Sequence, residues 1–84
     1  MKTVEIYTTR TCPYCIAAKG LLTKKSVPFT EIDVGADPAL RQTMTARADG
    51  RRSVPQVFID GKGIGGCDDL HALEKSGKLD AMLA

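Results

Sequence analysis

The way the hydrophobic period changes along these 84 residues restricts the fold more than any other feature of the chain. Apolar side chains alternate over about residues 2–8, which predicts a strand, and then follow helical spacing over about 13–25. A second alternating segment covers about 29–34, between a proline and a glycine. Strand, helix and strand in this order imply a right-handed parallel unit, so we expect an α/β fold.

The next segments predict a second helix and a hairpin. Asp37-Pro38 is typical of an N-cap followed by the first helical residue, and Gly50 is expected to stop that helix. Two short strands are predicted over 56–60 and 62–65. They flank Asp60-Gly61, a pair that favours a tight turn with positive φ at both positions, so these strands should be antiparallel.

The C-terminal segment predicts a last helix that opens with Asp68-Asp69 and ends before Gly77. A short turn is expected over 79–83. The complete order is βαβαββα, which gives a four-stranded mixed sheet flanked by helices. A hydrophobic content of 43% in so short a chain supports a single core, so we expect one domain over residues 1–84.

Charge and apolar patterning argue against two classes of function. A net charge of +2 is too small for the basic surface of a nucleic-acid binder. The longest apolar runs, such as Val57-Phe58-Ile59, are far shorter than the roughly 20 residues that span a bilayer. The N-terminus lacks a signal-like apolar segment, and three cysteines do not suit a secreted disulfide scaffold. We therefore expect a cytoplasmic monomer without nucleic-acid or membrane partners.

The candidate chemistry lies in Cys12-Pro13-Tyr14-Cys15, where the first strand leads into the first helix. Residues three apart on a helical turn lie about 5 to 6 Å apart, so this pair can form and open a disulfide without moving the backbone. Free N–H groups at the helix start favour a thiolate at Cys12, which we expect to be the nucleophile. Cys15, one turn inside and less solvated, is expected to stay a thiol and to act as the resolving cysteine.

A structural zinc site is the alternative interpretation of these cysteines. Cys67 and His71 supply a second half-site that could complete a four-ligand set with Cys12 and Cys15. However, a long stretch with its own strands and helix separates the two halves. We therefore expect no metal.

Three motifs in order resemble the small bacterial dithiol glutaredoxins over nearly the whole chain. They are the cysteine tetrad after Val4-Glu5-Ile6-Tyr7, the triplet Ser53-Val54-Pro55, and Gly65-Gly66-Cys67-Asp68-Asp69-Leu70. The resemblance implies a thioredoxin-like fold and an oxidoreductase with glutathione as co-substrate. Its substrates would be protein disulfides and protein–glutathione mixed disulfides, with glutathione reductase as an indirect partner.

The resemblance also implies a binding site for glutathione. Pro55 would be cis and face the cysteines, and Val54 would offer its backbone to the peptide part of glutathione. Asp68 would receive the ammonium of the γ-glutamyl group, and Arg41 the glycine carboxylate. The predicted glutathione-binding residues are Tyr14, Arg41, Val54, Pro55, Gly66, Cys67 and Asp68.

Several of these positions also have a structural interpretation. Without the resemblance, helix capping is the favoured role of Asp68 and Asp69. Cys67 is typical of a small packed side chain that could still be oxidised or glutathionylated. Tyr14 fits a wall of the groove or a cap over the thiols. Related sequences often carry lysine where this chain has Thr9, and Arg10 is the neighbouring cation that could replace it.

Two other functions stay open. A redoxin of this fold reduced by thioredoxin reductase would keep both cysteines but lack glutathione contacts, and the run that begins at Gly65-Gly66 argues against it. An iron–sulfur cluster carrier would join two chains through Cys12 and glutathione. Such carriers usually lack a proline after the first cysteine, and Pro13 is present here.

Overall fold

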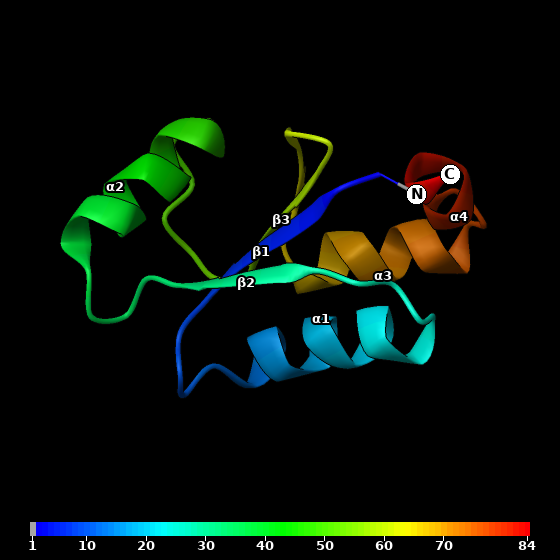
Figure 1. Cartoon of the computed structure of the whole chain (residues 1–84), viewed down its shortest axis with the longest axis horizontal. Coiled ribbons are helices and arrows are strands. Elements are labelled where there is room, and N and C mark those ends of the chain that lie inside the picture. Colours follow the sequence, from blue (N-terminus) through cyan, green and yellow to red (C-terminus); the bar gives the residue numbers. More distant parts are fainter. Residues whose placement is uncertain (1) are drawn as a thin grey trace.

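The computed structural model describes residues 2–84, which form a four-stranded sheet with helices on both faces (Figure 1). The elements are β1 (Val4–Thr8), α1 (Pro13–Lys24), β2 (Thr30–Asp33), α2 (Pro38–Arg47), β3 (Gln56–Ile59), β4 (Lys62–Gly65), α3 (Cys67–Lys75) and α4 (Leu79–Leu83). The predicted order βαβαββα is confirmed, with one addition. The expected C-terminal turn is a short helix, because Leu79 and Leu83 lie one turn apart and are both buried.

The strands lie in the order β2-β1-β3-β4. β1 pairs parallel with β2 through the crossover helix α1, and antiparallel with β3, which in turn pairs antiparallel with β4. Asp60 and Gly61 have φ values of 52° and 82°, so the tight turn predicted between β3 and β4 is confirmed. The sheet is therefore mixed, as the sequence predicted.

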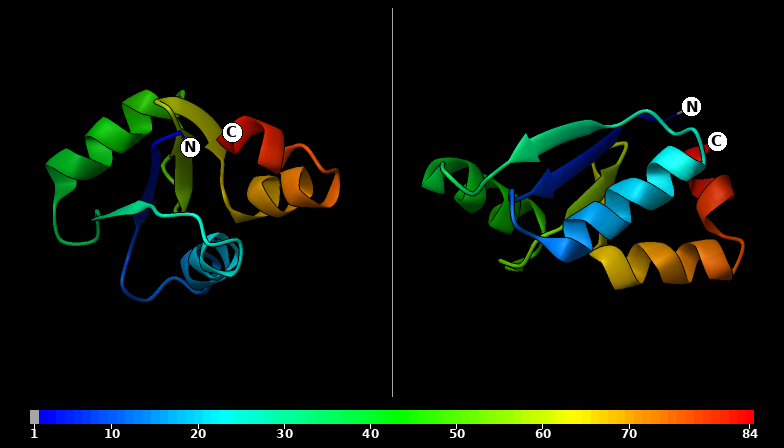
Figure 2. Two further views of the ribbon diagram at one scale, coloured as in Figure 1. Left: turned by 45° about the vertical axis from the view of Figure 1, so that its right-hand side comes forward. Right: turned by 90° about the horizontal axis from the view of Figure 1, so that it is seen from below.

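Alternation along β1 and β3 sends side chains to the two faces of the sheet. Val4 and Ile6 point into the larger apolar core under α1 and α3, while Tyr7 and Phe58 point into a smaller core under α2. Figure 2 shows α1 and α3 side by side on one face and α2 on the other. No helix within residues 2–84 is long and apolar enough to cross a membrane.

Local signals set the helix starts, and the start of α3 differs from the expected one. Asp37 caps α2 by accepting the N–H groups of Ala39 and Leu40 at 3.0 and 3.2 Å. Leu40 itself is 37% exposed, because α2 covers the sheet mainly through Met44, one turn further on. α3 begins one residue earlier than expected, at Cys67, with the extended backbone of Gly66 as its N-cap.

Candidate active site

The two cysteines of the tetrad lie at the start of α1. Cys12 is the N-cap, and Pro13 occupies the first helical position, where its missing N–H costs no hydrogen bond. The Cys12 sulfur accepts the N–H of Cys15 at 3.1 Å and donates to the Val54 carbonyl at 3.6 Å. Both thiols are reduced. A half-buried sulfur thus receives a backbone donor at a helix N-terminus.

Cys15 lies in a different environment, although it is only three residues away. Cys15 is only 1% exposed to solvent. Burial raises the pKa of the Cys15 thiol to about 12, and the hydrogen bond and charge of Cys12 add to the shift. Cys15 is therefore a neutral thiol near pH 7, which is the state expected for it from its place inside the helix.

A loop before β3 faces the cysteines. The Val54–Pro55 peptide bond is cis, as predicted, and the Val54 carbonyl points at the Cys12 sulfur. The amide of Gln56 donates to the Ser53 carbonyl at 3.0 Å, which ties the loop to the start of β3. At Gly66 a Cβ would lie only 3.1 Å from the Pro55 carbonyl oxygen, so glycine allows α3 to start close to this loop.

A cavity of about 240 Å³ opens between the cis-proline loop and the start of α3. Six of the seven residues predicted to bind glutathione line it, namely Tyr14, Val54, Pro55, Gly66, Cys67 and Asp68. The walls also include four residues that were not among the predicted glutathione-binding residues, namely Arg51, Ser53, Gln56 and Asp69. Tyr14 is 63% exposed and lies at the opening of this cavity.

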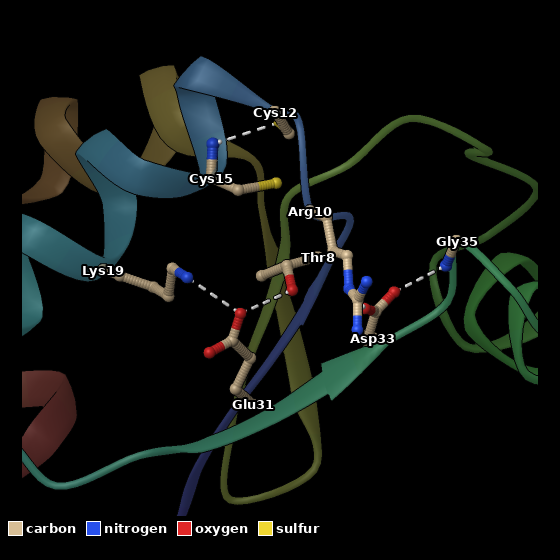
Figure 3. Close-up of polar contacts among 8 residues, drawn as sticks. All are labelled: Thr8, Arg10, Cys12, Cys15, Lys19, Glu31, Asp33 and Gly35. Atoms are coloured by element: carbon tan, nitrogen blue, oxygen red, sulfur yellow. Dashed lines mark hydrogen bonds and ion pairs between the residues drawn. The ribbon is translucent and has the colours of Figure 1, made fainter.

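Arg41 is the predicted residue that lies elsewhere. Its Nη2 atom donates to the Arg52 carbonyl at 2.8 Å, and its side chain lines a second cavity of about 580 Å³ together with Thr9. Arg10 also lines this second cavity, 92% exposed and 3.9 Å from the Asp33 carboxylate (Figure 3). The side chain of Arg10 is thus directed toward β2.

The two acidic residues at the start of α3 have different surroundings. The Asp69 carboxylate accepts the Gly66 N–H at 3.0 Å and pairs with Arg51 at 3.6 Å, so Asp69 caps the helix. Asp68 is exposed and lines the cavity without a hydrogen bond or ion pair to any described side chain. Of these two carboxylates at the start of α3, Asp68 is therefore the one left uncompensated for a ligand.

Cys67 is buried beside the cavity, and its thiol is not activated. Burial raises its pKa, and the charges of Asp68 and Cys12 add to the shift. His71, to which the sequence assigned no role, lies one turn further on, with Nδ1 2.9 Å from the Cys67 carbonyl oxygen and 3.4 Å from its sulfur. Across residues 2–84, no three or more His, Cys, Asp or Glu side chains are grouped to hold a metal ion.

Sequence reasoning missed a polar cluster beside Cys15. The Glu31 carboxylate accepts the Thr8 hydroxyl at 2.7 Å and the Lys19 ammonium at 2.8 Å (Figure 3). The only local signal is that Lys19 follows Cys15 by four residues, which places both on one side of α1. The partners Thr8 and Glu31 come from β1 and β2, and helical spacing does not reveal them.

A cysteine pair at a helix start, a cis-proline loop facing it and an adjoining cavity on this mixed sheet define a thiol–disulfide oxidoreductase of the thioredoxin fold. The glutaredoxin family model matches residues 4–64. The chain belongs to the glutaredoxin family, as the three motifs predicted.

Three known proteins show how close the similarity is. Glutaredoxin 3 of Escherichia coli (strain K12) is 53% identical over 83 residues, which cover 99% of each chain. The solution structure of glutaredoxin from Brucella melitensis is 53% identical, with a TM-score of 0.87 over 99% of this chain and 89% of that one. A crystal structure of a buckwheat glutaredoxin–glutathione complex is 30% identical, with a TM-score of 0.89 over 98% and 76% of the two chains.

Proposed function

We propose that this oxidoreductase uses glutathione to reduce protein disulfides and protein–glutathione mixed disulfides, with Cys12 as nucleophile and Cys15 as resolving cysteine. The observation that carries the proposal is the cavity beside Cys12, which is lined by the Val54 backbone and the exposed Asp68 carboxylate. The similar buckwheat protein forms a complex with glutathione, and this supports the same ligand here.

The chemistry of glutathione matches the groups around the cavity. Asp68 suits the ammonium of the γ-glutamyl group, and the free N–H groups at the start of α3 suit the neighbouring carboxylate. The backbone of Val54 pairs with the peptide part of the ligand. Arg41, from the second cavity, suits the glycine carboxylate, because a guanidinium can bind a carboxylate through two hydrogen bonds.

The reaction proceeds by two thiol–disulfide exchanges. Deprotonated Cys12 attacks the glutathione sulfur of a mixed disulfide, the substrate sulfur leaves and takes up a proton, and Cys12 is left bonded to glutathione. A second glutathione then attacks the glutathione sulfur of this Cys12–glutathione disulfide. This frees Cys12 and releases glutathione disulfide, which is the substrate of glutathione reductase. On a protein disulfide, Cys12 first attacks one substrate sulfur and forms a mixed disulfide with the protein. Cys15 then attacks the Cys12 sulfur, which closes the Cys12–Cys15 bond, breaks the bond to the substrate and releases the substrate as a dithiol.

The test is glutathione-dependent reduction of a small glutathione mixed disulfide, coupled to glutathione reductase. Cys12→Ser should lose all activity, because the other two described thiols, Cys15 and Cys67, are buried and have raised pKa values. Cys15→Ser should keep substantial activity, because the mixed-disulfide route does not need it, and Cys67→Ser should resemble wild type. A wild type that is inactive with glutathione but active with thioredoxin reductase would contradict the proposal.

Binding of glutathione is tested separately with Asp68→Asn. Loss of the carboxylate should raise KM for glutathione about threefold to tenfold with a smaller change in kcat, because an exposed charge pair adds modest binding energy. Asp49→Asn is the matched control, since Asp49 is exposed and lies outside this cavity. An equal KM for Asp68→Asn and the control would place the γ-glutamyl group elsewhere.

A further inference from the structure

The polar cluster beside Cys15 interrupts an otherwise apolar interface between α1 and the sheet. Ala18 and Leu22 on α1 pack against Val4 and Ile6 of β1. Further along the same face of β1, the inward side chain is the fully buried Thr8. Its hydroxyl is bound by Glu31, and Glu31 is paired with Lys19.

Lys19 is held near Cys15 by this cluster. A residue four positions on lies over the next turn of the same helix face. Figure 3 shows that both side chains leave α1 toward the sheet, and that the Lys19 ammonium is turned to Glu31. A lysine side chain has many rotamers in water, so the ion pair with Glu31, itself fixed by Thr8, restricts it to the neighbourhood of Cys15.

In the resolving step Cys15 must react as a thiolate, but its surroundings favour the neutral thiol. Burial is the largest cause of the raised pKa of Cys15, and Cys12 adds to it. The positive charge of Lys19 and a backbone hydrogen bond from Thr9 act in the opposite direction. Once Cys12 is part of a mixed disulfide it carries no charge, so Lys19 is then the charged group with the clearest influence on Cys15.

We propose that Lys19 assists the resolving step by favouring the deprotonated Cys15, and that Glu31 and Thr8 are the positioning residues that keep its ammonium beside Cys15. The inference rests on the proposed role of Cys15 as the resolving cysteine. Lys19 acts through the positive charge that its ammonium holds near the Cys15 sulfur, and it does not accept the proton of Cys15.

The assisted step is a balanced exchange. The Cys15 thiol gives its proton to solvent, and its sulfur attacks the Cys12 sulfur of the mixed disulfide. The bond between Cys12 and the substrate sulfur breaks as the Cys12–Cys15 bond forms. The leaving sulfur takes up a proton, so the substrate is reduced and the cysteine pair is oxidised.

The other charged or titratable groups on the elements around Cys15 have partners or lie at the surface. Arg10, in the loop before α1, pairs with Asp33 of β2. From α3, Cys67 is a buried thiol with a raised pKa, and Asp68 is exposed at the cavity. Glu31 of β2 reaches Cys15 only through Lys19, since it is hydrogen-bonded to Lys19 and Thr8.

The size of the effect follows from two opposing changes. For each unit by which the pKa of a thiol rises, its thiolate fraction near pH 7 falls about tenfold, while the thiolate becomes about threefold more nucleophilic. The net rate then falls about threefold per unit. We therefore expect Lys19→Gln to slow the resolving step about twofold to fivefold, and Lys19→Arg, which keeps the charge, to stay near wild type.

The experiment follows the oxidation of the reduced protein by glutathione disulfide, with acid quenching and mass spectrometry. Two rates are read separately, namely formation of the Cys12–glutathione mixed disulfide and its conversion to the Cys12–Cys15 disulfide. Lys19→Gln should slow only the second. Lys24→Gln is the matched control, because it removes an equal charge from the exposed C-terminal end of α1.

The Cys15→Ser background separates this role from a structural one. There the mixed disulfide forms but is not resolved, and Lys19→Gln should leave its rate of formation unchanged. Equal slowing of both steps, or no slowing of the second, would overturn the inference. If Cys15→Ser forms no mixed disulfide with glutathione disulfide, the proposed function itself fails and the inference falls with it.

Discussion

Two ion-paired clusters lie on opposite faces of the sheet and are built from the same kinds of groups. Both combine a cation from a helix, a glutamate from a strand and a hydroxyl from β1. On the α1 face these are Lys19, Glu31 and Thr8, and on the α2 face Arg47, Glu5 and Tyr7. Because their neighbours differ, we expect these similar clusters to have different roles.

The α2 cluster is surrounded by aromatic rings. The Arg47 guanidinium lies 4.2 Å from the centre of the Phe58 ring, and the Tyr7 and Phe58 rings meet edge to face at 5.5 Å. Arg47 also pairs with Glu5 at 3.0 Å. These contacts fasten α2 to the sheet, so we expect this cluster to affect stability and the α1 cluster to affect the reaction of Cys15.

The largest effect is expected at the ring that the α2 cluster packs around. Phe58 is fully buried, so Phe58→Ala should lower the free energy of unfolding by about 3 to 5 kcal/mol through lost burial and a cavity. Phe58→Leu keeps most of the volume and should cost about 1 to 2 kcal/mol. Denaturant unfolding measures both, and equal losses for the two variants would contradict the importance of filled volume.

Arg47→Gln tests whether the α2 cluster is purely structural. Loss of the cation–π contact and the ion pair should lower the free energy of unfolding by about 1 to 2 kcal/mol. The resolving rate of Cys15 should not change. Arg52→Gln, at an exposed position, is the control and should stay within about 0.5 kcal/mol of wild type. A slower resolving step in Arg47→Gln would remove the distinction between the two clusters.

The smallest effect concerns the pH dependence of stability through Glu31. The hydrogen bond from Lys19, and then that from Thr8, lowers the pKa of the Glu31 carboxyl. A lowered pKa stabilises the fold above the ordinary pKa of a glutamate, about 4.3, and this contribution disappears as the pH falls through the folded-state value. Glu31→Gln should therefore be less stable than wild type at pH 7, and the gap should close in acid.

The gap at pH 7 should stay below about 1 kcal/mol, because the Glu31 side chain is 40% exposed and solvent screens the pair. Urea unfolding of both proteins between pH 7 and pH 3 measures it. A gap that does not depend on pH would show that the Lys19–Glu31 pair adds no stability.

Much of the candidate site could be predicted because it depends on local geometry. The helix start at Pro13 places Cys12 as the N-cap, and the Val54-Pro55 motif led to the cis bond that the structure contains. Six of the seven predicted glutathione-binding residues, all from the three short motifs, also line one cavity. The placement of Arg41 was less predictable, because a long side chain on α2 selects its partner from a loop eleven residues away.

What the sequence by itself determined is the set of local structures: the order of strands and helices, the turn at Asp60-Gly61 and the cysteine pair at a helix start. Steric limits and helical spacing act between near neighbours, so local sequence carries this information. The sequence predicted that Cys15 is less solvated than Cys12, but only the tertiary structure decided that Cys15 is almost completely buried and that Thr8, Lys19 and Glu31 meet beside it. Desolvation and ion pairing depend on which distant segments pack together, and this is fixed when α1 closes over β1 and β2.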